Sequence, residues 1–129
     1  MFDGDLHSTL KHFGVSLLTT QLAPDLLAIR RIAIAEGARS GVGRLFYERG
    51  PRIGLKRIEA FVVAQMAAGR LRRNDSWQAT IHLVTLLEGD FPGRALLGVV
   101  DELTAERIEA QVEQAVTFFL TAYRADPPT

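Results

Sequence analysis

The residues able to bind a metal ion are few in this sequence and poorly spaced for that role. The chain contains no cysteine and three histidines, His7, His12 and His82. Two ligands on one face of a helix need a spacing of four residues, whereas His7 and His12 are five apart. Without cysteine, thiolate metal sites and cysteine nucleophiles are excluded. We therefore predict no metal site.

Groups for acid–base, nucleophilic or phosphate chemistry are also scattered. Glu36, Glu88 and Asp90 lie near apolar segments, but no spacing fixes the separation that paired acid–base catalysis requires. Gly41-Val42-Gly43 follows no predicted strand and lacks a following Gly-Lys-Ser or Gly-Lys-Thr, so a phosphate-binding loop is not indicated. No Gly-x-Ser-x-Gly motif occurs. The sequence therefore predicts no catalytic residues, no cofactor and no enzyme.

The whole chain has the size and composition of one ordinary globular domain. Its 129 residues are 47% hydrophobic and 23% charged, with a formal net charge of +0. This balance argues against disorder and against non-specific nucleic-acid binding. No apolar run approaches the ~20 residues of a membrane helix, and the acidic start of the chain differs from a basic secretory leader. Because the absence of cysteine fits a reducing compartment, we expect a cytoplasmic protein with no membrane partner.

Glycine and proline divide the first half of the sequence into helical segments. The first segment begins near Asp5 and ends before Pro24, and its apolar residues share one helical face: Leu6, Leu10, Phe13 and Leu17. A short helix is expected over residues 42–49. Gly50-Pro51 should end it and begin a fourth helix that runs to Gly69.

The second helix, from Pro24 to Gly37, is apolar nearly all round. Pro24 suits the first turn because its missing N–H has no intrahelical partner there. Only Arg30-Arg31 is strongly polar, and such a helix is usually central to a fold. Most of the arginines fall between residues 30 and 73, and the sequence after Asp75 is mostly acidic. This asymmetry indicates either solvated helix faces or a polar contact surface for another domain.

The second half of the chain predicts two longer helices. Asp75 is a suitable N-cap for the fifth helix, and Pro92-Gly93 should end or kink that helix. Thr104 is a suitable N-cap for the last helix, whose apolar stripe follows a 3.6-residue period: Ile108, Val112, Ala115, Val116, Phe119, Leu120 and Tyr123. No strand pattern occurs. We predict an all-α bundle of about six helices over residues 1–125, followed by a disordered tail at 126–129.

The fifth and last helices have more apolar surface than one core contact requires. Leu83 and Leu86 form a second stripe on the fifth helix, and Phe118 lies off the main stripe of the last helix. These faces indicate either core or the interface of a homodimer. Aromatic and methionine residues from four helices raise a similar choice between one shared core and a pocket lined mostly by apolar groups: Phe13, Phe46, Phe61, Met66 and Trp77.

Several segments of the sequence resemble successive parts of the domain of one known family. Ala28-Ile29-Arg30-Arg31-Ile32-Ala33-Ile34-Ala35-Glu36 is similar to that domain's second helix, and Arg44-Leu45-Phe46-Tyr47-Glu48-Arg49-Gly50-Pro51 to the short helix that follows. Ala67-Ala68-Gly69-Arg70-Leu71-Arg72, with Asp75, resembles the turn into the penultimate helix. Glu88-Gly89-Asp90 and Arg94-Ala95-Leu96-Leu97-Gly98 resemble that helix's end. Together these segments resemble the C-terminal domain of TetR/AcrR-type transcriptional repressors, and the likeness covers nearly the whole chain.

The resemblance implies a ligand-sensing and dimerisation domain of a bacterial transcription regulator, in which the last two helices form the dimer interface. We expect a homodimer and a small apolar effector. The pocket residues expected are Phe13, Leu17, Phe46, Phe61, Met66, His82 and Thr85, where His82 is either a polar ligand contact or a hydrogen-bonded core residue. The interface residues expected are Leu83, Leu86, Phe91, Ala115, Phe118 and Phe119.

Two features depart from the family pattern. Nothing in the sequence resembles the family's N-terminal helix-turn-helix, so we expect DNA binding only through a domain outside this chain. Pro92-Gly93 interrupts the penultimate helix where the family usually continues it. The alternative function left open is a helical interaction module that binds no ligand and forms mixed dimers with a complete regulator.

Overall fold

Seven helices account for most of the residues that the structure describes. The structure, a computed structural model, describes residues 3–125, with side chains from Leu6 onward. No strand occurs in this part of the chain, which confirms the predicted all-α fold. The helices are α1 (Asp3–Gln21), α2 (Pro24–Gly37), α3 (Val42–Arg49), α4 (Pro51–Ala67), α5 (Ser76–Glu88), α6 (Phe91–Leu96) and α7 (Ala105–Tyr123). The tail predicted at 126–129 lies outside the described residues.

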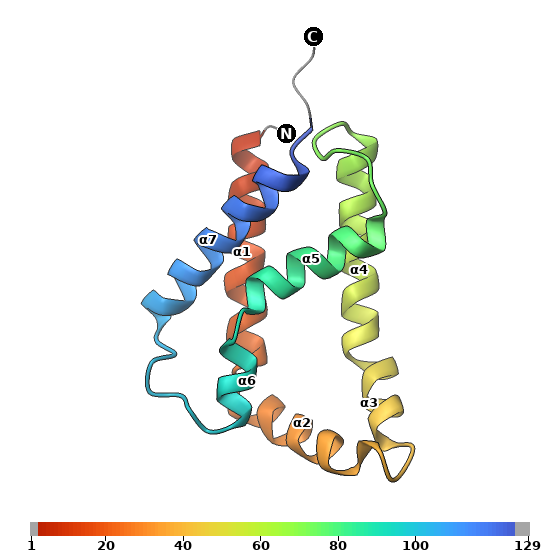
Figure 1. Ribbon diagram of the computed structural model, residues 1–129, viewed down its shortest axis with the longest axis vertical. Coiled ribbons are helices and arrows are strands. Elements are labelled where there is room, and N and C mark those ends of the chain that lie inside the picture. The colour runs from red at the N-terminus through yellow and green to blue at the C-terminus, as the bar shows by residue number, and fades with distance from the viewer. Residues whose placement is uncertain (1–2, 126–129) are drawn as a thin grey trace.

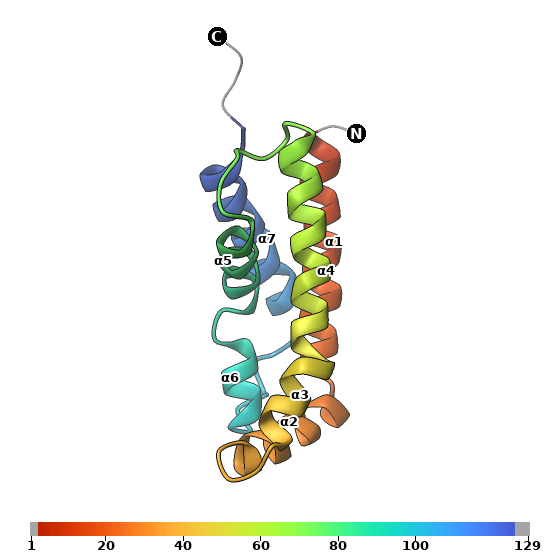
Figure 2. The same ribbon diagram turned by 90° about the vertical axis from the view of Figure 1, so that its right-hand side faces the viewer.

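The helices form two layers that are closed at one end. Figure 2 shows α1 and α4 in one layer and α5 and α7 in the other, and Figure 1 shows that α1 and α4 stand apart within their layer. Helices α2 and α3 connect the far ends of α1 and α4, and α6 lies between α5 and this base (Figure 1). The start of α1 and the end of α7 lie at the opposite end of the molecule. The most extensive helix contacts join α5 to α7, α1 to α7, and α4 to α5.

Proline and capping side chains set the helix starts where the sequence indicated. Pro24 and Pro51 each occupy the first turn of a helix, where no N–H donor is needed. The Asp75 carboxylate accepts a hydrogen bond from the Gln78 N–H at 2.8 Å, and the Thr104 hydroxyl accepts one from Arg107 N–H at 3.2 Å. Both side chains satisfy backbone donors that the first helical turn leaves unpaired. The two predicted N-caps are therefore confirmed.

The break after α5 falls earlier than predicted. Helix α5 ends at Glu88, and Gly89 adopts a φ of 52°, a left-handed conformation that glycine tolerates at little cost. Pro92 is not the terminator, because it lies in the first turn of α6 and starts that helix. The prediction that Pro92-Gly93 ends or kinks the fifth helix was therefore wrong, because the helix ends at Glu88, before these residues. The resulting short helix α6 is the element beyond the six expected.

One hydrophobic core lies between the two layers. All seven residues of the apolar stripe predicted on the last helix are buried in α7. They pack against one cluster of buried side chains that includes Leu6, Leu10, Leu18, Val62, Met66, Leu71, Ala79, Leu83, Leu87 and Phe91. Gly14 allows the closest approach of α1 to this cluster, since a Cβ there would lie 2.6 Å from Leu87 Cδ2. Burial of this stripe is what holds α7 across α1 and α5.

Helix α2 is not central, contrary to the sequence-based prediction. Only Leu27 and Ala33 are buried in it. Ile32 is 61% exposed, and Ile29 and Ile34 are also exposed. Helix α2 lies across the base of the molecule (Figure 1), where it contacts α1, α3 and α6. Its apolar character therefore leaves a hydrophobic surface on this end of the molecule.

A charged side chain ties α2 to the second layer. Arg31 Nη2 donates to the Ala95 carbonyl at 2.9 Å, and Arg31 Nε donates to the Leu96 carbonyl at 3.1 Å. These carbonyls lie at the C-terminal end of α6, where a cation also interacts favourably with the helix dipole. The six-residue helix α6 is thus fixed from both sides, by Phe91 in the core and by Arg31 from the base.

Candidate functional site

An apolar cavity of about 240 Å³ lies where α1, α4 and α5 meet. Two of these helices come from the first layer and one from the second, so the cavity occupies a gap between layers. Phe13 and Phe61 pack against the hydrophobic core without being fully buried, which leaves ring surface for a ligand. The lining residues are Thr9, Leu10 and Phe13 of α1, Arg57, Ile58 and Phe61 of α4, and Leu83 of α5.

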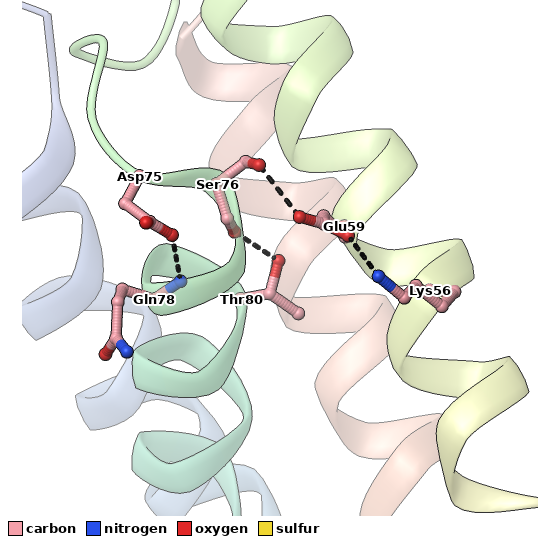
Figure 3. Close-up of polar contacts among 6 residues, drawn as sticks. All are labelled: Lys56, Glu59, Asp75, Ser76, Gln78 and Thr80. Atoms are coloured by element: carbon pink, nitrogen blue, oxygen red, sulfur yellow. Dashed lines mark hydrogen bonds and ion pairs between the residues drawn. The ribbon is translucent and has the colours of Figure 1, made fainter. Parts of the chain in front are cut away.

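Polar contacts between α4 and α5 hold two walls of this cavity together. Ser76 Oγ, at the start of α5, donates to Glu59 Oε2 on α4 at 2.8 Å (Figure 3). Lys56 Nζ lies 3.4 Å from Glu59 Oε1 and 4.7 Å from the centre of the Trp77 ring. Thr80 is fully buried, and its hydroxyl is satisfied by the Ser76 carbonyl at 2.8 Å. The start of α5 is therefore anchored before the helix reaches Leu83.

The residues predicted to line a pocket are distributed over several places. Phe13 and Phe61 line the cavity together. Met66 is buried in the core, and Leu17 packs against that core. Phe46 lies apart, in an open hollow on α3 that is lined by Val42, Leu45, Phe46, Arg49 and Gly50. Most of these lining residues are exposed.

Two predicted pocket residues lie on the outside of α5. His82 and Thr85 are both exposed and do not line the cavity. His82 Nδ1 instead forms a hydrogen bond with the Tyr123 hydroxyl, at 2.6 Å. The sequence left two alternatives for His82, a polar contact to a ligand or a hydrogen-bonded residue of the core. His82 is hydrogen-bonded, but it lies on the surface rather than in the core.

Sequence reasoning missed five of the residues that line the cavity. Leu10, Ile58 and Leu83 carry the signal of ordinary core positions, so periodicity alone cannot separate them from the rest of the core. Leu83 was assigned to the dimer interface. Thr9 and Arg57 are polar residues on amphipathic helices, and in the sequence such residues are typical of positions that face solvent. What could have pointed to Arg57 is its place one helical turn before Phe61, on the same face of α4.

The six predicted interface residues divide by exposure. Leu83, Phe91, Ala115 and Phe119 are buried within the chain itself. Leu86 and Phe118 are exposed, and Phe118 is exposed by 62%. Leu86 on α5 and Phe118 on α7 are therefore the two predicted interface residues whose side chains a partner could reach. The interface itself stays a prediction.

The carboxylates of Glu36 and Glu88, which the sequence placed near apolar segments, each have one polar partner among the described residues. Glu36 pairs with Arg39, and Glu88 accepts a hydrogen bond from Gln21 at 2.7 Å. The hydrogen bond from Arg94, on α6, to the carboxylate of Glu102, in the segment that leads to α7, raises the pKa of Arg94. Within residues 3–125, no group of three or more His, Cys, Asp or Glu residues is placed to hold a metal ion. No helix in the same range is long and apolar enough to span a membrane.

Comparison with solved structures places this fold among known proteins. A TetR transcriptional regulator from Agrobacterium tumefaciens superimposes with a TM-score of 0.85 at 30% identity, over 98% of this chain and 61% of that one. The flavonoid-responsive regulator FrrA superimposes with a TM-score of 0.82 at 32% identity, over 91% of this chain and 60% of that one. A structure from Mesorhizobium loti described as a TetR-family regulator shares the fold, with a TM-score of 0.88 at 22% identity over 97% and 61%.

The family assignment comes from the sequence itself. Residues 8–125 match the family described as AefR-like transcriptional repressor, C-terminal domain. Comparison with curated proteins gives no match. The chain spans about three fifths of the length of the solved regulators that it resembles. Because the match covers nearly all the described residues, this chain belongs to the TetR family of transcriptional regulators and corresponds to their AefR-like C-terminal domain.

Proposed function

We propose that this chain is the effector-binding and dimerisation domain of a TetR-family regulator and catalyses no reaction. The observation that carries the proposal is the apolar cavity between α1, α4 and α5. Ligand sites are usually concave and mostly apolar, with a few polar groups that orient the ligand. The cavity has this composition, with Thr9 and Arg57 beside apolar side chains.

The ligand class is a small apolar compound, and the relatives support this. One of the solved regulators, at 32% identity, is described as flavonoid-responsive, so a member of the same family responds to an aromatic compound. The volume of about 240 Å³ lies below the ~300–1,000 Å³ of sites for drug-sized ligands. A ligand enclosed by this cavity is therefore small, or it reaches out through the opening.

The second part of the proposal is self-association through α5 and α7. Phe118 and Leu86 are exposed on these adjacent helices, and burial of such side chains in a two-fold contact is favourable. A domain of this kind works in the bacterial cytoplasm, since the relatives from Agrobacterium and Mesorhizobium are transcription regulators. DNA binding belongs to the part of such regulators that this chain does not span.

The cavity is tested with a neutral aromatic probe, cinnamyl alcohol, added to isotope-labelled protein. We expect amide chemical-shift changes that cluster around the cavity, at Leu10, Ile58 and Leu83. In Ile58→Phe the added ring occupies the cavity, and these changes should disappear. Val63→Phe is the matched control, because Val63 is exposed on the same helix and does not line the cavity. Absence of localised changes in the unsubstituted chain, or their persistence in Ile58→Phe, would contradict the proposal.

A further inference from the structure

Arg57 is the one charged side chain among the described residues that line the cavity. The other lining groups are apolar, apart from the Thr9 hydroxyl, and Arg57 itself is exposed. An arginine in this position covers apolar surface with its methylene stem and keeps its guanidinium toward water. The positive charge of Arg57 therefore lies at the opening of the cavity rather than in its interior.

The protein provides no anionic partner for this charge. No hydrogen bond or ion pair joins Arg57 to another residue whose side chain the structure describes. Helix α4 has a single acidic residue, Glu59, and its two carboxylate oxygens are engaged by Ser76 and Lys56 (Figure 3). On the facing helix α1, the sequence from Leu6 to Gln21 contains no Asp or Glu. A bound anion at Arg57 would therefore meet little competition.

Other arginines lack this combination of features. Arg31 donates to backbone carbonyls, and Arg44 pairs with Glu48. Arg52 also has no hydrogen-bond partner among the described residues, but it does not line the cavity. Arg49 has no described partner either and lines the open hollow beside Phe46, so Arg57 differs in lining the cavity between α1, α4 and α5. Thr9, on α1, is the other lining residue whose side chain carries a polar group.

We propose that the cavity selects a small amphipathic acid, whose apolar body lies against Leu10, Phe13 and Phe61 and whose carboxylate pairs with Arg57 at the opening. The inference rests on the proposed function, since it names the ligand class of the same cavity. A guanidinium can bind a carboxylate through two parallel charge-assisted hydrogen bonds, which are stronger than bonds to a neutral group. A neutral amide of the same shape offers only one acceptor oxygen and carries no charge.

The experiment compares cinnamate with cinnamamide, which have nearly the same shape, by calorimetric titration of the full chain. We expect cinnamate to bind about two- to fivefold more tightly than the amide, since an ion pair that stays in contact with water adds only modestly to affinity. In Arg57→Gln the ratio of the two dissociation constants should fall to near one, while the amide binds as before. Arg52→Gln, the matched control on the same helix, should keep the preference for the acid.

The outcomes separate the acid preference from the cavity itself. A ratio near one in the unsubstituted chain, or a preference that survives in Arg57→Gln, overturns the proposed role of Arg57. If both compounds bind equally and Ile58→Phe abolishes both, the cavity is a ligand site without selectivity for acids. If neither compound binds, the acid proposal fails, and the chemical-shift experiment with cinnamyl alcohol decides separately whether the cavity takes neutral ligands.

Discussion

The imidazole of His82 and the hydroxyl of Tyr123 form a hydrogen bond of 2.6 Å that links the outer face of α5 to the end of α7. Tyr123 is buried, and its ring stacks on that of Phe119 at a centroid distance of 4.8 Å. His82 is exposed, so the pair spans from core to surface at the junction of these two helices. A buried tyrosine hydroxyl usually needs such a partner.

Loss of this hydroxyl should destabilise the fold. Tyr123→Phe keeps the ring stacking but removes the hydrogen bond, and we expect the free energy of unfolding to fall by about 0.5–1.5 kcal/mol. Urea denaturation measures the change. Tyr47→Phe is the matched control, because Tyr47 is exposed on α3 and no described residue bonds to its hydroxyl. Equal stability of the two variants would show that the His82–Tyr123 bond contributes nothing.

Two glycine-to-alanine substitutions should have opposite signs. An alanine at position 14 would place its Cβ 2.6 Å from Leu87 Cδ2 and 2.8 Å from Val112 Cγ1, and overpacking of this kind costs about 1–3 kcal/mol. An alanine at position 54, within α4, would meet no atom within 4 Å. There the lower entropy of the unfolded chain should stabilise the protein by about 0.4–1 kcal/mol. The midpoint of chemical denaturation should fall for the alanine variant at position 14 and rise for the one at position 54. A shift of both midpoints in the same direction would contradict this prediction.

Arg31 should control the local stability of α6. Arg31→Gln removes the guanidinium that binds the Ala95 and Leu96 carbonyls, so we expect faster hydrogen exchange of the amides from 94 to 99. The buried stripe of α7 should keep its protection, because Arg31 does not contact it. Arg30→Gln serves as the control, since Arg30 has no hydrogen bond to any described residue. Unchanged exchange at α6 in Arg31→Gln would rule out this role.

The dimer proposal has a test that leaves the core intact. Phe118→Glu replaces an exposed side chain, so the folded chain should persist while self-association is lost. Light scattering should give a mass near twice 14.2 kDa for the unsubstituted chain and near 14.2 kDa for the variant. Ile32→Glu is the control, because Ile32 has nearly the same exposure, 61%, but lies on α2 at the base. A monomeric unsubstituted chain at high micromolar concentration would defeat the proposal.

The helices were predictable because their boundaries depend on short-range chemistry. Pro24, Asp75 and Thr104 act within one helical turn, and the sequence shows that turn directly. The end of α5 was misplaced because proline both terminates and initiates helices, and only the φ of Gly89 shows which role Pro92 has. The exposure of α2 could not be predicted either. Apolar composition does not say whether a helix lies at the centre or at an edge.

The cavity was only partly predictable, since it depends on packing between distant parts of the chain. Phe13 and Phe61 were identified by their size and aromatic character, and they do lie at one cavity. The apolar periodicity that includes Leu83 is the same whether this side chain packs in the core, contacts a partner chain or lines a ligand site. His82 suggested a buried polar contact, but His82 is exposed, and its partner Tyr123 is 41 residues away in the sequence, at the end of α7.

Helix α5 contributes to both proposed sites over a single turn. Leu83 lines the cavity, and Leu86, three residues later, is exposed on the face proposed for dimerisation. A helix transmits displacement as a nearly rigid rod, so a ligand that shifts Leu83 also shifts Leu86. Linkage then makes the effect reciprocal: the factor by which the ligand changes dimer affinity is the factor by which the dimer changes ligand affinity. The effector concentration that half-saturates the protein would therefore depend on how many copies of it the cell makes.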